Sequence, residues 1–327
     1  MTISGDWGAR NSASCWLMPG SLPLSAWQSV CVRRLHKEWA MRMLRGWCAG
    51  SLLFAQSVLS AGQALAADDG TLVDRLEGPQ VVTEVVTYRA NGEEHVGLIA
   101  RDAKAKGRRP GILLVHEWWG LNSYARKRAE QLAGLGYVVM AVDMYGEGRT
   151  AEHPEDAKAF SSAVMSDWPK AESSFNSALA VLRSRPEVDG DRLAAIGYCF
   201  GGGVVLNMAL SGAPLKAVVS FHGSPGIAVE NPEPFAGRVV IQNGEADSLV
   251  SQQGLDTLLS TFESLGTRTT LIQYPGAKHA FTNPESDAKA ARYDLPLGYD
   301  ASADAASWQV MLNLFNGVFK SPKNPAP

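Results

Sequence analysis

Short apolar runs alternate with segments of helical spacing over residues 111–319, and this alternation restricts the fold more than any other feature of the sequence. The runs are rich in β-branched residues, and their continuous apolar character is typical of strands that helices cover on both faces. The expected strands are Gly111–Val115, Tyr137–Val142, Leu193–Gly197, Ala217–Phe221, Val239–Gln242 and Thr269–Gln273, and the expected helices are Ser123–Leu135, Pro154–Met165, Glu172–Arg183, Gly202–Leu210, Leu255–Leu265 and Ala301–Phe319. This order predicts an α/β fold with a doubly wound, mostly parallel sheet.

Two further strand-like segments, Val81–Arg89 and His95–Arg101, precede this region and are separated by Asn91-Gly92. This dipeptide favours a tight turn because both residues tolerate a positive φ. We therefore expect an N-terminal antiparallel hairpin at the edge of the sheet.

The N-terminal 66 residues have a formal charge of +4, which leaves −7 for the rest of a chain whose total is −3. Within residues 41–66, Arg42 and Arg45 precede an uncharged run that ends in Ala64-Leu65-Ala66, the order of a secretory signal peptide. The run Trp47–Ala61 is shorter than the roughly 20 residues that span a bilayer. We expect export to the periplasm or the medium with cleavage near Ala66 and no stable membrane anchor; a buried amphipathic helix is the alternative.

Residues 1–40 lie ahead of this segment, and we interpret them as a disordered extension or the result of a start codon assigned too early. Residues 68–327 contain no repeat or long linker and are expected to form a single domain and a monomer. Because this acidic part has no cluster of Lys and Arg, we expect no nucleic-acid partner.

The strand Leu193–Gly197 continues into Gly-Tyr-Cys-Phe-Gly and then a helix, which matches the Gly-x-nucleophile-x-Gly elbow of α/β-hydrolases with Cys199 in place of serine. The alternative is a buried structural cysteine beside a glycine-rich helix start. However, Cys15, Cys31 and Cys48 would be removed with the leader, so Cys199 would be the only thiol and would have no disulfide partner. This isolation favours a reactive role.

A thiol has an ordinary pKa of about 8.5, so a nucleophilic cysteine needs a base or a field that stabilises the thiolate. In this fold the chain order is nucleophile, acid, histidine. Asp247 and His279 each follow an expected strand in that order, and Glu245 competes for the acid role. His222 comes one strand too early and is interpreted as a pocket-wall residue. Individually, Asp247 could be a solvated turn residue and His279 a surface histidine.

A His-Glu-Trp-Trp-Gly segment follows the strand Gly111–Val115, where this fold supplies the second backbone N–H of the oxyanion hole. The expected donors are the N–H groups of Trp118 and Phe200. Glu117 lies among apolar residues and could hold the resting thiol of Cys199 through a hydrogen bond. An ordinary loop carboxylate paired to Arg or Lys is the alternative.

These motifs, His-Glu-x-x-Gly, Gly-Tyr-Cys-x-Gly-Gly and Lys-His-x-Phe, resemble those of the dienelactone hydrolases, also called carboxymethylenebutenolidases, from about Val81 to Phe319. The resemblance implies an α/β-hydrolase that cleaves an ester or lactone through a thioester, with Cys199, Asp247 and His279 as its triad and without cofactor or metal. It also implies that Glu117 contacts the uncharged thiol until the substrate displaces it.

The chain departs from this family where substrate carboxylates are bound. Asn283 stands where the family has an arginine, four residues after the histidine, and the helix that carries the second arginine has only Lys158. Arg149 could supply a cation from another loop, although an ion pair with Glu147 or Glu152 would also explain it. Substrate contacts are expected from Trp119, Tyr145, Arg149, His222 and Phe281.

Two other functional classes fit the same sequence. The first is a non-catalytic protein that binds a small molecule on this fold, because fold does not determine function. The second is a thiol redox protein in which Cys199 cycles through sulfenic acid and requires an external thiol.

Overall fold

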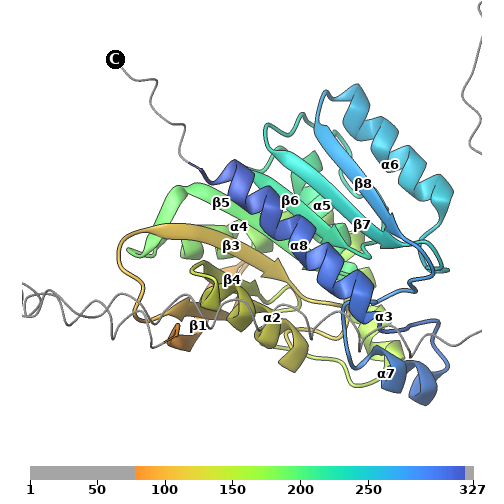
Figure 1. Ribbon diagram of the computed structural model, residues 1–327, viewed down its shortest axis with the longest axis horizontal. Coiled ribbons are helices and arrows are strands. Elements are labelled where there is room, and N and C mark those ends of the chain that lie inside the picture. Colours follow the sequence, from red (N-terminus) through yellow and green to blue (C-terminus); the bar gives the residue numbers. More distant parts are fainter. Residues whose placement is uncertain (1–77, 321–327) are drawn as a thin grey trace, which may run out of the picture. The chain divides into compact units, whose positions relative to one another are not determined.

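The computed structural model describes residues 78–320 and arranges them around one eight-stranded sheet (Figure 1). The strands are β1 (Val81–Ala90), β2 (Glu93–Asp102), β3 (Arg109–Val115), β4 (Val138–Val142), β5 (Val188–Tyr198), β6 (Ala217–Phe221), β7 (Arg238–Gly244) and β8 (Arg268–Tyr274). The helices are α2 (Ser123–Gly134), α3 (Pro154–Ser166), α4 (Trp168–Ser184), α5 (Phe200–Leu210), α6 (Gln252–Ser264), α7 (Ser286–Tyr293) and α8 (Ala301–Val318).

The spatial order of the strands is β1-β2-β4-β3-β5-β6-β7-β8. All neighbours from β4 to β8 pair in parallel, whereas β1 pairs antiparallel with β2, and β2 with β4. The turn between β1 and β2 contains Asn91 at φ 53° and Gly92 at φ 82°, as the hairpin prediction requires. The predicted α/β-hydrolase fold, with its mostly parallel sheet and antiparallel N-terminal strands, is confirmed.

Helices cover both faces of the sheet, and the side chains of β3 show how. Ile112 and Leu114 are fully buried in the cluster that includes α2 and α8, the face turned to the viewer in Figure 1. Leu113 and Val115 point the other way, into the cluster formed with α4, α5 and α6. Burial of each such side chain stabilises the fold by about 1.5–3 kcal/mol relative to exposure. The last four residues of β3 therefore contribute alternately to two cores.

Two helices differ from the sequence prediction. Helix α4 begins at Trp168, earlier than expected, because the proline that follows lies in the first turn, where it costs no hydrogen bond. Its N-cap is Asp167, whose carboxylate accepts from the N–H of Lys170 at 3.2 Å. Helix α7 was not predicted, because its eight residues include no Val, Leu, Ile, Met or Phe that would indicate a face packed on the core.

The predicted extension and signal peptide, residues 1–40 and 41–66, lie outside the described residues. Within residues 78–320, no helix is long and apolar enough to cross a membrane.

Candidate active site

The carboxyl ends of the parallel strands meet at one edge of the sheet, and the three residues predicted as a triad lie in loops at this edge. Cys199 follows β5, Asp247 follows β7 and His279 follows β8. The structure brings their side chains into one chain of contacts: Nε2 of His279 lies 3.1 Å from Sγ of Cys199, and Nδ1 lies 2.8 Å from Oδ2 of Asp247. Both distances are within hydrogen-bond range for these atoms.

Cys199 lies at a sharp, strained turn between β5 and α5. Its backbone has φ 54° and ψ −116°, a conformation that costs free energy for a residue with a side chain. Tight packing maintains it: a Cβ added to Gly197 would lie 2.0 Å from the carbonyl oxygen of Gly201. The N–H of Gly201 in turn donates to the carbonyl of His116 at 3.1 Å. The predicted elbow is therefore present, and its glycines allow strand, helix and the loop after β3 to approach.

The carboxylate of Asp247 fixes the orientation of the imidazole of His279. Oδ1 of Asp247 accepts from the N–H of Leu249 at 2.9 Å, and Oδ2 accepts the Nδ1–H of His279. Burial by itself would lower the pKa of His279, but the negative thiolate of Cys199 and hydrogen bonds with Asp247 and Cys199 raise it to about 10. The imidazole is therefore protonated at neutral pH when it faces a thiolate, which favours an imidazolium–thiolate pair.

Glu117 is 3% exposed. We had expected its carboxyl to hydrogen-bond to the thiol of Cys199, but none of the hydrogen bonds within residues 78–320 joins the two groups. Oε2 of Glu117 accepts instead from Nδ2 of Asn283 at 2.7 Å, while Sγ of Cys199 faces His279. Burial raises the pKa of Glu117, and the opposing effects are the hydrogen bond from Asn283 and the positive charge of Lys289. Asn283, which stands where the family has an arginine, thus gives the buried carboxyl of Glu117 an uncharged hydrogen-bond donor.

This burial predicts how stability depends on pH. The pKa of the Glu117 carboxyl is higher in the folded state than its ordinary value of 4.5, so the folded protein keeps this proton to a higher pH than the unfolded chain does. The contribution of this group to stability is therefore fully present below pH 4.5. It is lost as the pH rises through the folded pKa. We expect Glu117→Gln to remove this loss, so that the free energy of unfolding of the variant relative to wild type increases between pH 4.5 and 8. The gain is about 1.4 kcal/mol for each unit of pKa shift.

Urea unfolding at several pH values measures this difference. Glu263→Gln is the matched control, because Glu263 is an exposed residue of α6 and is not among the charges that act on Glu117. Parallel pH profiles for wild type and Glu117→Gln would show that the buried carboxyl does not control this dependence.

The expected oxyanion-hole donors lie at the start of α5 and in the loop after β3. Phe200 is the first residue of α5, and Trp118 follows the His116 carbonyl that binds Gly201. Among the hydrogen bonds of residues 78–320, none uses the N–H of Phe200 or of Trp118. Both donors therefore remain available to an anion, and the N-terminus of α5 favours negative charge there.

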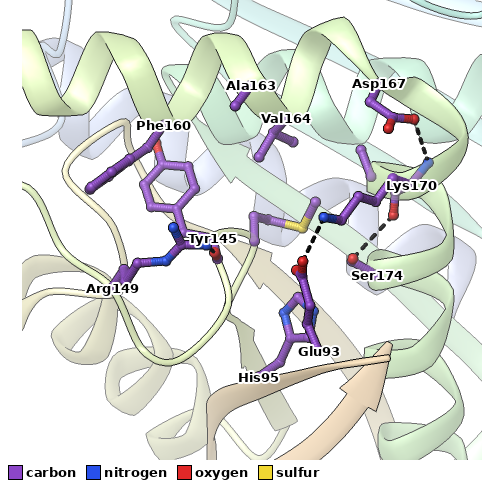
Figure 2. Close-up of a pocket in the computed structure, with 12 residues that line it drawn as sticks. Glu93, His95, Tyr145, Arg149, Phe160, Ala163, Val164, Asp167, Lys170 and Ser174 are labelled. Carbon is purple, nitrogen blue, oxygen red and sulfur yellow. Dashed lines mark hydrogen bonds and ion pairs between the residues drawn. The ribbon is translucent and has the colours of Figure 1, made fainter. Parts of the chain in front are cut away.

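Tyr145 and Arg149 line a cavity of about 110 Å³ that contains none of the three triad residues (Figure 2). Tyr145 is buried and its hydroxyl donates to the carbonyl of Trp118 at 2.9 Å. Arg149 forms no ion pair with Glu147 or Glu152; its guanidinium donates to the carbonyls of Tyr145 and Gly146. The cation that we considered for substrate binding is therefore bound within its own loop.

The other three expected substrate contacts are also engaged inside the protein. Trp119 is 4% exposed and lies under Nζ of Lys289, 4.7 Å from the ring centre. Phe281 is fully buried and packs against the ring of His222, with 5.3 Å between ring centres. His222 is fully buried with both ring nitrogens hydrogen-bonded, so the pocket-wall position that we expected does not describe it.

Sequence reasoning missed two residues next to the triad. Thr282 bridges His222 and Tyr124 through Oγ1, at 2.7 Å from each. Asn283 was identified only as a departure from the family, whereas the structure gives it a direct contact with Glu117. The one available signal was their position directly after His279. Within residues 78–320, no group of three or more His, Cys, Asp and Glu residues could hold a metal ion.

Comparison with known proteins agrees with this geometry. The model of the dienelactone hydrolase family matches residues 96–319. A similar solved structure, the dienelactone hydrolase-like promiscuous phosphotriesterase P91 from metagenomic libraries, is 31% identical with a TM-score of 0.68, over 74% of this chain and 100% of that chain. Another, m3DLH, is 34% identical with a TM-score of 0.68, over 73% and 99%.

A curated relative covers the same part of the sequence. The protein named "Putative carboxymethylenebutenolidase" of Synechocystis sp. is 26% identical over 256 residues, which are 73% of this chain and 98% of that protein. The family model spans more than half of the chain, and the solved relatives above 30% identity match nearly their whole length. The chain belongs to the dienelactone hydrolase family.

Proposed function

We propose that this hydrolase cleaves a small ester or lactone with Cys199 as nucleophile, His279 as acid and base, and Asp247 as the residue that orients His279. The observation that carries the proposal is the line of contacts from Sγ through the imidazole to the carboxylate, at 3.1 and 2.8 Å, with the sulfur on a strained elbow. Nucleophile, base and orienting group in this relation are the requirement for acyl transfer.

The first half of the reaction forms a thioester. The thiolate of Cys199 adds to the carbonyl carbon, and the N–H groups of Phe200 and Trp118 stabilise the resulting oxyanion. The carbon–oxygen bond to the leaving group then breaks, and the imidazolium of His279 donates its Nε2 proton to the departing oxygen. An alcohol leaves, or, for a lactone, the ring opens and its hydroxyl stays attached.

The second half releases the acid. Neutral His279 accepts a proton from water, and the oxygen of that water adds to the thioester carbonyl. The carbon–sulfur bond breaks, which yields the carboxylic acid and returns the thiolate beside the imidazolium. Asp247 keeps Nδ1 protonated throughout, so Nε2 is always the nitrogen that exchanges protons.

Glu117 has a role before this cycle in the same proposal. It holds the uncharged thiol in a resting state, and the arrangement with Sγ toward His279 is the active one.

Two features support an uncharged substrate. Asn283 is neutral and already donates to Glu117, and Arg149 is bound to its own loop.

Reaction with excess 4-nitrophenyl acetate tests the proposal. Wild type should release one equivalent of nitrophenolate in a burst, and peptide mapping by mass spectrometry should find the acetyl group on Cys199. We expect Cys199→Ala to show no burst and to lose at least about 10³-fold in kcat/KM, because the oxyanion hole alone retains only a small part of catalysis.

A thermal unfolding curve like that of wild type would establish that Cys199→Ala is folded. Equal turnover of the ester by wild type and Cys199→Ala would contradict the hydrolase proposal and favour a non-catalytic binding protein. Sulfenic acid at Cys199 after peroxide, without any acetylation by the ester, would favour the redox alternative.

A further inference from the structure

His222 connects the loop of the nucleophile to the loop of the catalytic base. It follows β6, is fully buried, and has φ 41°, a backbone conformation that is unusual for a residue with a ring. Its Nδ1 lies 3.1 Å from the backbone nitrogen of Cys199, whose N–H is shared with the carbonyl of Phe221 at 3.0 Å. Its Nε2 lies 2.7 Å from Oγ1 of Thr282. No step of the proposed reaction uses this ring.

The contacts of the two ring nitrogens determine the protonation of His222. The N–H of Cys199 can only donate, so Nδ1 accepts and carries no proton. In the neutral ring the proton is then on Nε2 and is donated to Thr282. Burial, followed by the positive charges of His279 and Arg128, holds the pKa of His222 well below its ordinary value. The uncharged tautomer with the proton on Nε2 is therefore the form present at neutral pH.

Thr282 is itself fixed from the other side. Its Oγ1 lies 2.7 Å from the hydroxyl of Tyr124, and its carbonyl accepts from Arg128 at 2.6 Å. Arg128 also donates to the Tyr124 hydroxyl at 3.2 Å and forms an ion pair with Asp304. Helices α2 and α8 thereby anchor the segment that begins three residues after His279.

We propose that His222 is a positioning residue that keeps Sγ of Cys199 within hydrogen-bond distance of Nε2 of His279. This inference rests on the proposed function and extends it. The ring ties the nucleophile's own amide to the anchored Thr282, so movement of one loop moves the other. Displacement of a reacting group by about 1 Å can reduce a rate about 10²-fold.

Charge adds a second requirement. The rings of His222 and His279 lie 5.3 Å apart, centre to centre, so a cation at residue 222 would repel the imidazolium that pairs with the thiolate. A neutral side chain with a hydrogen-bond acceptor at this position meets both conditions. Lysine or arginine would meet neither.

Alkylation of Cys199 by iodoacetamide tests this role without ester turnover. We expect His222→Phe, which keeps a ring of similar shape but no nitrogen, to lower the second-order rate constant at pH 7 by roughly 10- to 100-fold. His222→Asn, whose side-chain oxygen can accept the Cys199 N–H, should recover most of the loss. For 4-nitrophenyl acetate the loss should appear in kcat and leave KM within about twofold.

Two controls separate positioning from a general loss of packing. His95→Phe removes another buried histidine, 2% exposed, whose Nδ1 contacts the carbonyl of Asp143 and not the elbow; its alkylation rate should match wild type. Thr282→Val keeps His222 but removes its partner, so it should lower the rate as His222→Phe does. If His222→Phe does not fold, Thr282→Val provides the decisive measurement.

The outcomes distinguish this inference from the proposed function. Rate constants equal to wild type in folded His222→Phe, or in Thr282→Val if the former does not fold, would overturn the positioning role. Equal losses in His222→Phe and His222→Asn would also contradict it, because the hydrogen bond would then be irrelevant. Slower alkylation in a protein that hydrolyses no ester would leave the positioning role intact and remove the proposed function.

Discussion

Replacement of His279 with alanine should lower kcat/KM for 4-nitrophenyl acetate by at least about 10³-fold. General acid and base catalysis by a positioned histidine contributes about 10²- to 10⁴-fold, and in the proposed mechanism the same imidazole also pairs with the thiolate of Cys199. Beside that thiolate the pKa of His279 is raised to about 10, so the imidazole is a cation at neutral pH in that state. Without it, alkylation of Cys199 by iodoacetamide should require a higher pH than in wild type, because less thiolate is present.

Stopped-flow kinetics and alkylation profiles from pH 5 to 10 measure both effects. His153→Ala is the matched control, because His153 is exposed and its ring lies near that of Tyr293, with 5.9 Å between ring centres. Retention of wild-type activity by His279→Ala would remove His279 from the mechanism. A rate loss with an unchanged alkylation profile would limit its role to proton transfer after the nucleophile has attacked.

The position of the triad could be predicted from the sequence because each residue follows a strand with a strong apolar signal. In a parallel sheet, the carboxyl ends of all strands lie at one edge, so loops far apart in the chain are brought together there. The elbow indicated Cys199 as the proposed nucleophile, and the chain order of the fold restricted the choice of acid and histidine. Asp247 and His279 are 32 residues apart in the chain and 2.8 Å apart in the structure.

The contacts around the triad could not be predicted in the same way, because they depend on loop conformation and not on strand order. His222 was expected to line a pocket, yet its positive φ turns the ring back toward the amide of Cys199. Asn283 and Glu117 are 166 residues apart, and neither motif indicates that one donates to the other. Helix α7 was missed for a different reason: its eight residues are mostly small or charged and include no Val, Leu, Ile, Met or Phe. The signal peptide and the cleavage near Ala66 remain predictions.

The second large effect should come from a single methyl group at Gly197. Its Cβ would lie 2.0 Å from the carbonyl oxygen of Gly201 and 2.7 Å from the nitrogen of Gly202, both backbone atoms of α5 that no side-chain rotation can move. We expect Gly197→Ala to reduce the free energy of unfolding by about 3 kcal/mol or more, at the upper end of what overpacking costs. Hydrolysis should be lost as well, because α5 carries Phe200 and fixes the elbow.

Gly317→Ala is the matched control, since it makes the same chemical change in α8 at a position where no atom beyond the chain neighbours and the helix's own backbone lies within 4 Å of the new Cβ. It should instead increase stability by about 0.5–1 kcal/mol, because alanine loses less backbone entropy in a helix. Urea unfolding followed by circular dichroism measures both variants. If Gly197→Ala were as stable as Gly317→Ala, the strand and helix would not be in contact at the elbow, and the strained backbone of Cys199 would need another cause. If only Gly197→Ala is destabilised, the contact between β5 and α5 that holds Cys199 in its strained turn also stabilises the fold. The geometry of the elbow and the stability of the protein could then not be altered independently.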